Sequence, residues 1–428
     1  MTGQHLVLCE GPDVEGTLRG AYARYLAGRY RQFLTLGSAL PTALSGAHGQ
    51  VVDLLDGALA TDERQLLSCF ASPAIGTPLR CLPLRDELPE FRARIDDAVA
   101  AMMPHLLFEM GLRGLLAGSF VWEHGAPRLA SLVVGGEVIP PEGASGLVFS
   151  TTCVAAIADE TEIATLPLDD DGMRAACEQG NGFRFERRYH PVGNVTHFAT
   201  LDHNPIAAFE THPNKSGNPV DLGDRPEDEW IDMLDRAFGL IESFMPGTFA
   251  EMQMMLREVI PVGYDEKRHL SASYREAVGT MYLTLHPNLM TMAEAVLHEF
   301  QHNKFNVASD SVEYLENAFH PLYKSPIRPD PRPLWGILLA VHAFLPVAEL
   351  YRRMRDGGHP FAALAGFEER MSDLDLKNHE GMEMLRAHAR FTPPGLALFA
   401  DLEALEQRHL AERVARGLSN VPTEVHVA

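Results

Sequence analysis

Apolar residues recur at helical spacing through the first part of the chain. Intervals of three and four residues between them predict amphipathic helices over 14–33, 52–66 and 87–114. Pro104 lies inside the third of these segments, so we expect that helix to break or kink there. The region from about Asp13 to Gly118 is therefore predicted to be mainly helical.

The pattern changes between residues 119 and 211. Short runs rich in β-branched and aromatic residues alternate there with Gly, Pro and Asp, which is typical of strands and turns. The predicted strands fall at 119–122, 129–134, 147–157, 183–189 and 195–201. A polar stretch rich in Pro and Gly over 212–227 then predicts a loop or a boundary.

Helical spacing returns at 228–244 and 248–259, and alternating polar and apolar residues predict a strand at 280–285. The expected fold class is α+β: mainly helical, with a sheet-rich middle section and a helical C-terminal half that binds a metal. A chain of 428 residues is too long for one ordinary core. We expect an N-terminal helical region over 1–118, a sheet-rich region over 119–225 and a metal-binding catalytic region over 226–428.

Composition and charge narrow the possible partners. The net charge of −22 argues against nucleic acid and against an anionic membrane, because the field of the protein would repel both. The five cysteines are scattered without a C-x-x-C pair, which favours reduced thiols in a cytoplasmic protein. The first residues lack a basic stretch and a long apolar run, so we expect no signal peptide, and we expect no membrane span.

The most informative motif is His298-Glu299-Phe300-Gln301-His302. A helix repeats every 3.6 residues, so two histidines four positions apart lie on one face and both imidazoles can reach one metal ion. Thr291 followed by Glu294 forms a T-x-x-E capping box, which predicts a helix that begins at about Met292. The alternative is an exposed helix with two unrelated histidines.

Two histidines do not hold a metal firmly, so a third protein ligand is needed. The nearby candidates are Asp310, Glu313, Glu316, His320 and His342. A zinc peptidase of the glutamate-ligand type would take Glu313 or Glu316 from the next helix. His342 stands in an almost wholly apolar helical run, where a buried imidazole needs partners for both nitrogens. It is either the third ligand or a satisfied core histidine, and Pro346, four residues later, predicts a kink that would aim it.

Two arginines precede this run in the segment Arg328-Pro329-Asp330-Pro331-Arg332-Pro333. The three prolines hold the backbone extended, so both guanidinium groups are presented from a stiff support. A guanidinium on such a support matches a carboxylate in a bidentate way. The alternative is an Arg–Asp ion pair that only holds the loop.

Together these motifs, with Ser271-Ala272-Ser273, Glu276-Ala277 and Gly279, resemble the H-E-x-x-H peptide-modification family over about residues 270–350. Its members are bacterial proteins associated with ribosomally made peptide natural products, described as iron(II)- and 2-oxoglutarate-dependent peptide β-hydroxylases. The chain departs from the family at Leu339, where many members have a histidine, so the third ligand stays open.

The resemblance implies that His298, His302 and His342 bind iron(II) and that 2-oxoglutarate places its distal carboxylate at Arg332 or Arg328. A side-chain β-carbon of a precursor peptide would then be hydroxylated, in natural-product maturation. Glu299 would orient a ligand or accept a proton.

We also expect the strand at 280–285 to dock the peptide. The main rival is a zinc metallopeptidase in which Glu299 activates a zinc-bound water. The third possibility is a non-catalytic peptide-binding protein with a structural metal.

Overall fold

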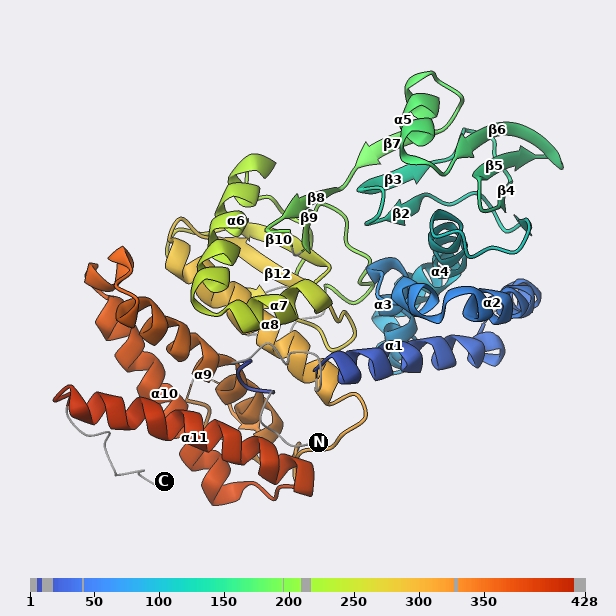
Figure 1. The fold of residues 1–428 in the computed structure, drawn as a ribbon. Coiled ribbons are helices and arrows are strands. Elements are labelled where there is room, and N and C mark those ends of the chain that lie inside the picture. Colours follow the sequence, from blue (N-terminus) through green and yellow to red (C-terminus); the bar gives the residue numbers. More distant parts are fainter. Residues whose placement is uncertain are drawn as a thin grey trace.

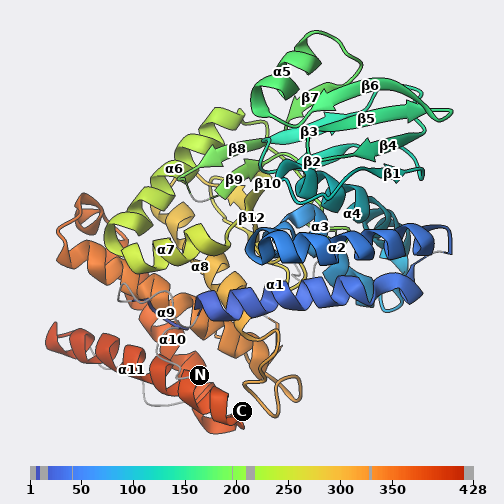
Figure 2. The same cartoon turned by 45° about the vertical axis from the view of Figure 1, so that its right-hand side comes forward.

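The computed structural model describes residues 6–9, 18–40, 42–194, 196–208, 217–326 and 330–418. Helices dominate both ends of the chain and the sheets lie in its middle, so the predicted α+β class is confirmed (Figure 1). In Figure 2 the N-terminal helices (blue) lie at the right, and the C-terminal helices (orange to red) lie at the lower left, below the central five-stranded sheet.

The N-terminal part consists of α1 (Leu18–Leu34), α2 (Thr42–Cys69), α3 (Pro73–Cys81) and α4 (Arg92–Leu112), with short 3-10 turns between them. The sequence predicted a break or a kink at Pro104, and the break is wrong because α4 continues through this residue. Every residue from Met102 to Gly111 is buried. Packing on all sides therefore offsets the one backbone hydrogen bond that the proline removes. Helix α2 is interrupted instead at Asp62, whose φ of −156° is not helical.

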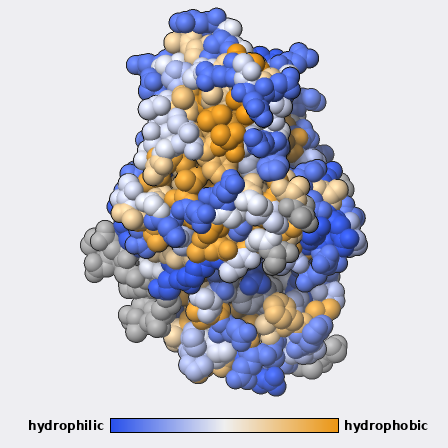
Figure 3. All heavy atoms as spheres, turned by 90° about the vertical axis from the view of Figure 1, so that its right-hand side faces the viewer, coloured by the Kyte–Doolittle hydropathy of each residue, from blue (hydrophilic) through white to orange (hydrophobic). Residues whose placement is uncertain are grey.

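Two antiparallel sheets follow. The first has the strand order β1-β4-β5-β6 and the second the order β2-β3-β7. Their bounds are β1 (Phe120–Trp122), β2 (Leu129–Ser131), β3 (Gly136–Ile139), β4 (Gly146–Phe149), β5 (Cys153–Ala158), β6 (Thr161–Pro167) and β7 (Arg184–Arg187). Helix α5 (Asp170–Glu178) joins β6 to β7 and was not predicted. On the side of the molecule that carries these sheets, apolar side chains gather in a band between polar ones (Figure 3).

The central sheet has the order β11-β12-β10-β9-β8. It joins β8 (Tyr189–Val192) and β9 (Thr196–Ala199) to β10 (Glu258–Tyr264), β11 (Ser271–Ala272) and β12 (Thr280–Leu285). Strands from both sides of the expected boundary at residue 225 are thus hydrogen-bonded into one sheet. Strand β12 coincides with the strand predicted at 280–285, whereas the helix predicted at 248–259 ends earlier, because the chain turns extended at β10.

Helices α6 (Glu227–Phe244) and α8 (Leu289–Ala308) pack against each other, and α8 also packs on β12. Helix α9 (Leu334–Asp356) lies against α8, and α10 (Phe367–His388) and α11 (Pro393–Ala415) cover α9. Helix α7 (Pro246–Met255) and the short pair β13 (Leu322–Tyr323) and β14 (Arg332–Pro333) complete the region. Helix α8 is therefore central, between the sheet and the C-terminal helices.

Helix α9 is long and apolar enough to cross a bilayer by length and composition alone. However, 72% of its apolar window is buried inside the protein, as in the core helix of a soluble protein. It continues through Pro346 to Asp356 without interruption. None of the five cysteines, which all lie in the described ranges, forms a disulfide bond.

Candidate functional site

Helix α8 begins at Leu289, earlier than predicted. The side chain of Asn288 is the N-cap and accepts hydrogen bonds from the backbone N–H groups of Met290 and Thr291. Asparagine is among the best N-cap residues, and here it precedes the proposed capping box by one turn. The predicted role of Glu294 in a capping box is therefore wrong. Its carboxylate instead accepts from Tyr351 and Arg370 on two other helices.

His298 and His302 lie together on the face of α8 that is turned toward α9. Their ring centroids are 4.3 Å apart at an angle of 80°. The ring of Phe344, on α9, lies 4.3 Å from the ring of His298. The two imidazoles thus share one face of a helix, as the sequence predicted. Both rings lie at the interface between α8 and α9.

Both imidazoles are electrically neutral at pH 7. Burial lowers the pKa of His298 well below 6.5, and the nearby His302, His269 and Arg370 lower it further. Burial also lowers the pKa of His302, against an opposing effect from Glu299. A neutral imidazole keeps a lone pair on one nitrogen, which is the form that binds metal ions.

The ring nitrogens of this pair are incompletely satisfied. Within the described ranges, Nδ1 of His298 and Nδ1 of His302 are both buried without a hydrogen-bond partner. Buried polar atoms in native proteins are nearly always bonded, and an exception calls for an unseen water, ion or ligand. Two orphaned imidazoles in contact are a chemically suitable donor set for a divalent transition metal.

His342 lies on α9 and is fully buried. Its Nε2 donates a hydrogen bond of 2.9 Å to the backbone carbonyl of Leu6, and its ring lies 4.9 Å from the ring of Phe305. A carbonyl only accepts, so this bond leaves Nδ1 as the nitrogen with the lone pair. That Nδ1 is also buried and without a partner in the described part of the chain. Burial lowers the pKa of His342 to about 3, with a further effect from Lys304.

The three histidines do not form one cluster in the described residues. No group of three or more His, Cys, Asp or Glu side chains lies close enough together there to hold a metal ion. His342 as the third ligand therefore stays a prediction. The bond from its Nε2 to Leu6 has the pattern of a metal-binding histidine, which usually donates its second N–H to a carbonyl or carboxylate.

The other third-ligand candidates lie outside any helix, in the connection between α8 and α9. Asp310 forms ion pairs with Arg29 and Arg80, at 3.2 and 2.6 Å. The next helix that would present Glu313 or Glu316 to a zinc ion is absent from the described residues 309–326, so that version of the peptidase prediction is wrong. The chain there is extended and turned, with a bridge from Leu315 to Phe391.

The arginine segment divides at the edge of the described ranges. Arg328 lies outside them. The Nε of Arg332 is 2.9 Å from the Asp330 carboxylate, which is the ion pair considered as the alternative for this loop. Arg332 precedes α9, whereas Phe344, whose ring contacts His298, lies ten residues into the helix. About 15 Å of helix axis therefore separates the first residue of α9 from Phe344. The role of Arg332 and Arg328 in binding 2-oxoglutarate stays a prediction.

Glu299 points toward the sheet. Its carboxylate accepts a hydrogen bond of 2.7 Å from the hydroxyl of Ser273, which directly follows β11, and the residue is buried. Asn303, one turn later, donates to the same hydroxyl at 3.2 Å. The carboxylate is thus fixed in the layer between α8 and the sheet. Ser273 belongs to the serine pair of the resemblance, but its hydrogen bond to Glu299 could not be read from spacing.

A cavity of about 990 Å³ opens beside His298. It lies between the first turns of α8, the loop that joins β10 to β11, and the segment from α9 to α10. Its polar lining includes Lys267, His269, Ser271, Glu294 and Arg370. Sequence analysis missed Lys267, His269 and Arg370, because no local spacing links them to the histidine motif.

The position of β12 within the sheet bears on the expectation that this strand docks the peptide. Strand β12 is buried along its whole length and is paired on one side with β10 and on the other with β11. Docking of an extended peptide on β12 is therefore wrong, because neither of its edges is open. The edge strand beside the cavity is β11, which contributes Ser271 to the lining.

No family model matches this chain, and a search of curated proteins finds no relative.

Proposed function

We propose that this chain is an iron(II)- and 2-oxoglutarate-dependent enzyme that hydroxylates a side-chain β-carbon of a ribosomally made precursor peptide. The observation that carries the proposal is the His298–His302 pair, with rings 4.3 Å apart and both Nδ1 atoms buried and unbonded within the described residues. The motif resemblance over residues 270–350 supplies the reaction class. The five cysteines without disulfide bonds fit a cytoplasmic setting.

The residues present fit a metal in part. His298 and His302 would hold it, and His342 is a further buried imidazole whose Nδ1 has no hydrogen-bond partner within the described residues. When bound, iron with 2-oxoglutarate and dioxygen would supply the oxidation of an unactivated carbon–hydrogen bond. The protein supplies binding, orientation and the exclusion of water. The apolar rings of Phe344, Phe361 and Phe367 line the cavity next to His298 and would keep bulk water from the reacting carbon.

The setting of Glu299 favours hydroxylation over peptide hydrolysis. In a zinc peptidase this glutamate must reach a metal-bound water on the substrate side. Here its carboxylate accepts a hydrogen bond from Ser273 and the residue does not line the cavity. Its charge acts on His302, whose pKa it raises against the larger lowering by burial. Glu299 is therefore assigned as a positioning residue for the histidine pair, and the zinc metallopeptidase is the alternative.

The deciding experiment is turnover of candidate precursor peptides with anaerobically purified full-length protein, iron(II), 2-oxoglutarate and air. We expect succinate release and a peptide mass gain of one oxygen atom. The variant His302→Leu should abolish both, whereas His124→Gln, a change at an exposed histidine in the connection between β1 and β2, should not. Cleaved peptide with bound zinc would establish the peptidase instead. If neither a hydroxylated nor a cleaved peptide forms, both assignments are refuted.

A further inference from the structure

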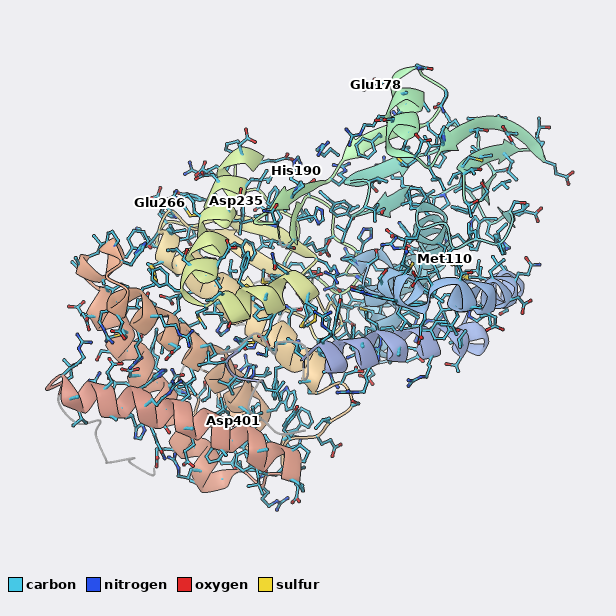
Figure 4. The ribbon with its side chains drawn as sticks, viewed as in Figure 1. Met110, Glu178, His190, Asp235, Glu266 and Asp401 are labelled. Carbon is cyan, nitrogen blue, oxygen red and sulfur yellow. The ribbon has the colours of Figure 1, made fainter. Side chains whose placement is uncertain are left out.

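The cavity beside His298 carries positive charge in a chain of net charge −22. Three cationic side chains line it, namely Arg236 from α6, Lys267 from the β10–β11 loop and Arg370 from α10. Glu294 is the single carboxylate among its lining residues. Figure 4 shows Glu266, the neighbour of Lys267, on the loop beside the helix that bears Asp235, so α6 and this loop form one side of the cavity.

The carboxylate of Glu294 is already engaged. It accepts from Arg370 through Nη2 at 2.7 Å and through Nε at 3.1 Å, and it accepts from the hydroxyl of Tyr351. Arg370 also pairs with Asp373 at 2.9 Å. This network fixes Arg370 but leaves no carboxylate for Lys267, which makes no ion pair within the described residues. The exposed pair of Arg236 with Asp232 is a surface contact of little energetic weight.

Two helix ends add to the positive potential. The first turn of α8, through Asn288 and Met290, and the first turn of α10, through Gly366 and Phe367, both line the cavity. The N-terminus of a helix carries a partial positive charge, which favours a nearby anion. The N-cap of α10 is Gly366, at φ 86°. Since glycine has no side chain, the N-cap accepts no side-chain hydrogen bond from the N–H groups of the first turn.

The remaining wall is apolar. Phe344, Phe361, Leu364 and Phe367 line it, next to the ring of His298. The cavity therefore offers an apolar wall and a cationic rim around one imidazole of the candidate metal pair. Such a surface suits an amphipathic ligand with one anionic group. The cationic rim also favours anions from a distance, because apolar walls concentrate the local field.

We infer that this cavity binds a carboxylate-bearing ligand, with Lys267 and Arg370 of its lining as the contacting cations. The inference rests on the proposed function in one respect: the carboxylate would belong either to free 2-oxoglutarate or to an acidic residue of the peptide. Both sources present the same chemistry to the same residues.

The test measures binding to the metal-free, full-length protein by calorimetry, without turnover. The probes are 2-oxoglutarate, the capped tripeptide acetyl-Phe-Asp-Phe-amide and its neutral counterpart acetyl-Phe-Asn-Phe-amide. We expect at least one carboxylate probe to bind; where the acidic peptide binds, we expect its neutral counterpart to bind about fivefold more weakly. Binding of 2-oxoglutarate alone assigns the rim to the co-substrate, and binding of the acidic peptide alone assigns it to the substrate side chain.

Lys267→Gln should weaken the carboxylate probe by about fivefold, and Lys267→Glu by about tenfold or more. The matched control is Lys324→Gln, a second exposed lysine that does not line the cavity, and it should leave the affinity unchanged. The inference is overturned if no carboxylate probe binds, or if Lys267→Gln and Lys324→Gln behave alike. It stands if binding follows this pattern but no succinate forms during turnover, a result that would refute only the proposed reaction.

Discussion

The two polar faces of helix α8 both carry buried polar atoms, but these atoms are differently bonded. On the face toward the sheet, Asn303 accepts a hydrogen bond from the backbone N–H of Gly279 at 2.6 Å and donates to the carbonyl of Thr280 at 3.1 Å. Glu299 on the same side accepts from Ser273. Each of these polar groups joins two elements of the fold.

On the face toward α9, polar atoms are buried without hydrogen-bond partners in the described ranges. Nδ1 of His298 and Nδ1 of His302 have no hydrogen-bond partner in the described ranges, and the same holds for Nδ1 of His342 across the interface. A buried polar atom without a partner costs about 1–3 kcal/mol. The contrast teaches that the sheet-facing groups stabilise the fold, while the α9-facing groups reduce its stability, a cost that the proposed metal would offset.

The largest effect is expected at Lys304, a fully buried charged residue of the helix. Its Nζ lies 2.7 and 2.9 Å from the two carboxylate oxygens of Glu251, and both side chains are fully buried. Lys304→Met should lower the free energy of unfolding by about 3–5 kcal/mol, because it leaves a buried carboxylate without its cation. Urea denaturation measures this loss.

The double variant Lys304→Met/Glu251→Leu should recover most of that stability, since an apolar pair of similar volume avoids the uncompensated charge. A single variant that lost less than about 1 kcal/mol would contradict the claim that bonded polar groups hold α8 in place.

Asn303→Ala tests the sheet-facing side itself. The change leaves the N–H of Gly279 and the carbonyl of Thr280 buried without their side-chain partner, so we expect a loss of about 2–3 kcal/mol in urea denaturation. Asn303→Asp keeps the acceptor for Gly279 but sets a buried carboxylate oxygen against the carbonyls of Thr280 and Glu299, so it should lose at least as much. Iron(II) affinity should be unchanged in both, and a weakened affinity would show that the two faces are not separable.

The opposite face of the sheet extends the comparison to Asp202, a carboxyl group that is hydrogen-bonded but whose ionised form is disfavoured by burial. The hydroxyl of Tyr282 donates to both carboxylate oxygens of Asp202 at 3.0 and 3.1 Å. Burial nevertheless raises the pKa of Asp202 from 3.8 to about 7. Between pH 4 and pH 7 the native state therefore keeps a proton that the unfolded state has released, so the free energy of unfolding falls as the pH rises through that window.

Asp202→Asn should remove this dependence. We expect the variant to be about 2 kcal/mol more stable than the wild type at pH 8, and equal to it near pH 4. The buried Glu258, whose pKa burial also raises, should leave some pH dependence in both proteins. Equal stability of variant and wild type at pH 8 would contradict the raised pKa.

Much of this arrangement follows from local sequence. The alternation at 280–285 predicted β12 correctly, and the four-residue spacing placed His298 and His302 on one helix face, because both depend on the period of a single element. Errors arose where tertiary packing decides. Pro104 does not break α4, since the surrounding core compensates for it.

The rest of the candidate site depends on contacts between distant segments. Leu6 reaches His342 across 336 positions, and Arg370 reaches Glu294 across 76. Neither pair has a pattern in the linear sequence, because a hydrogen bond between side chains or backbone groups of different elements has no fixed spacing. The edge role of β11 was missed for the same reason: two residues are too short to show alternation.

The smallest expected effect on the metal-free protein is at the histidine pair. His302→Leu replaces a neutral imidazole that has an unbonded buried nitrogen with an apolar side chain of similar size. The lost polar atom had no partner to leave behind, so the free energy of unfolding should not fall and should rise by about 1 kcal/mol, the lower end of the cost of an unbonded buried atom. This contrasts with Asn303→Ala, one position along the same helix.

Metal should separate the wild type from this variant. Iron(II) or zinc at about a thousand times its dissociation constant should stabilise the wild type by about 4 kcal/mol, because a ligand that binds only the native state shifts the unfolding equilibrium. His302→Leu should lose nearly all of that gain, while the exposed control His124→Gln should keep it. If His302→Leu instead destabilised the metal-free protein as much as Asn303→Ala does, the imidazole would be a structural group like those that face the sheet. The contrast between the two faces of α8 would then give no reason to assign a metal to either.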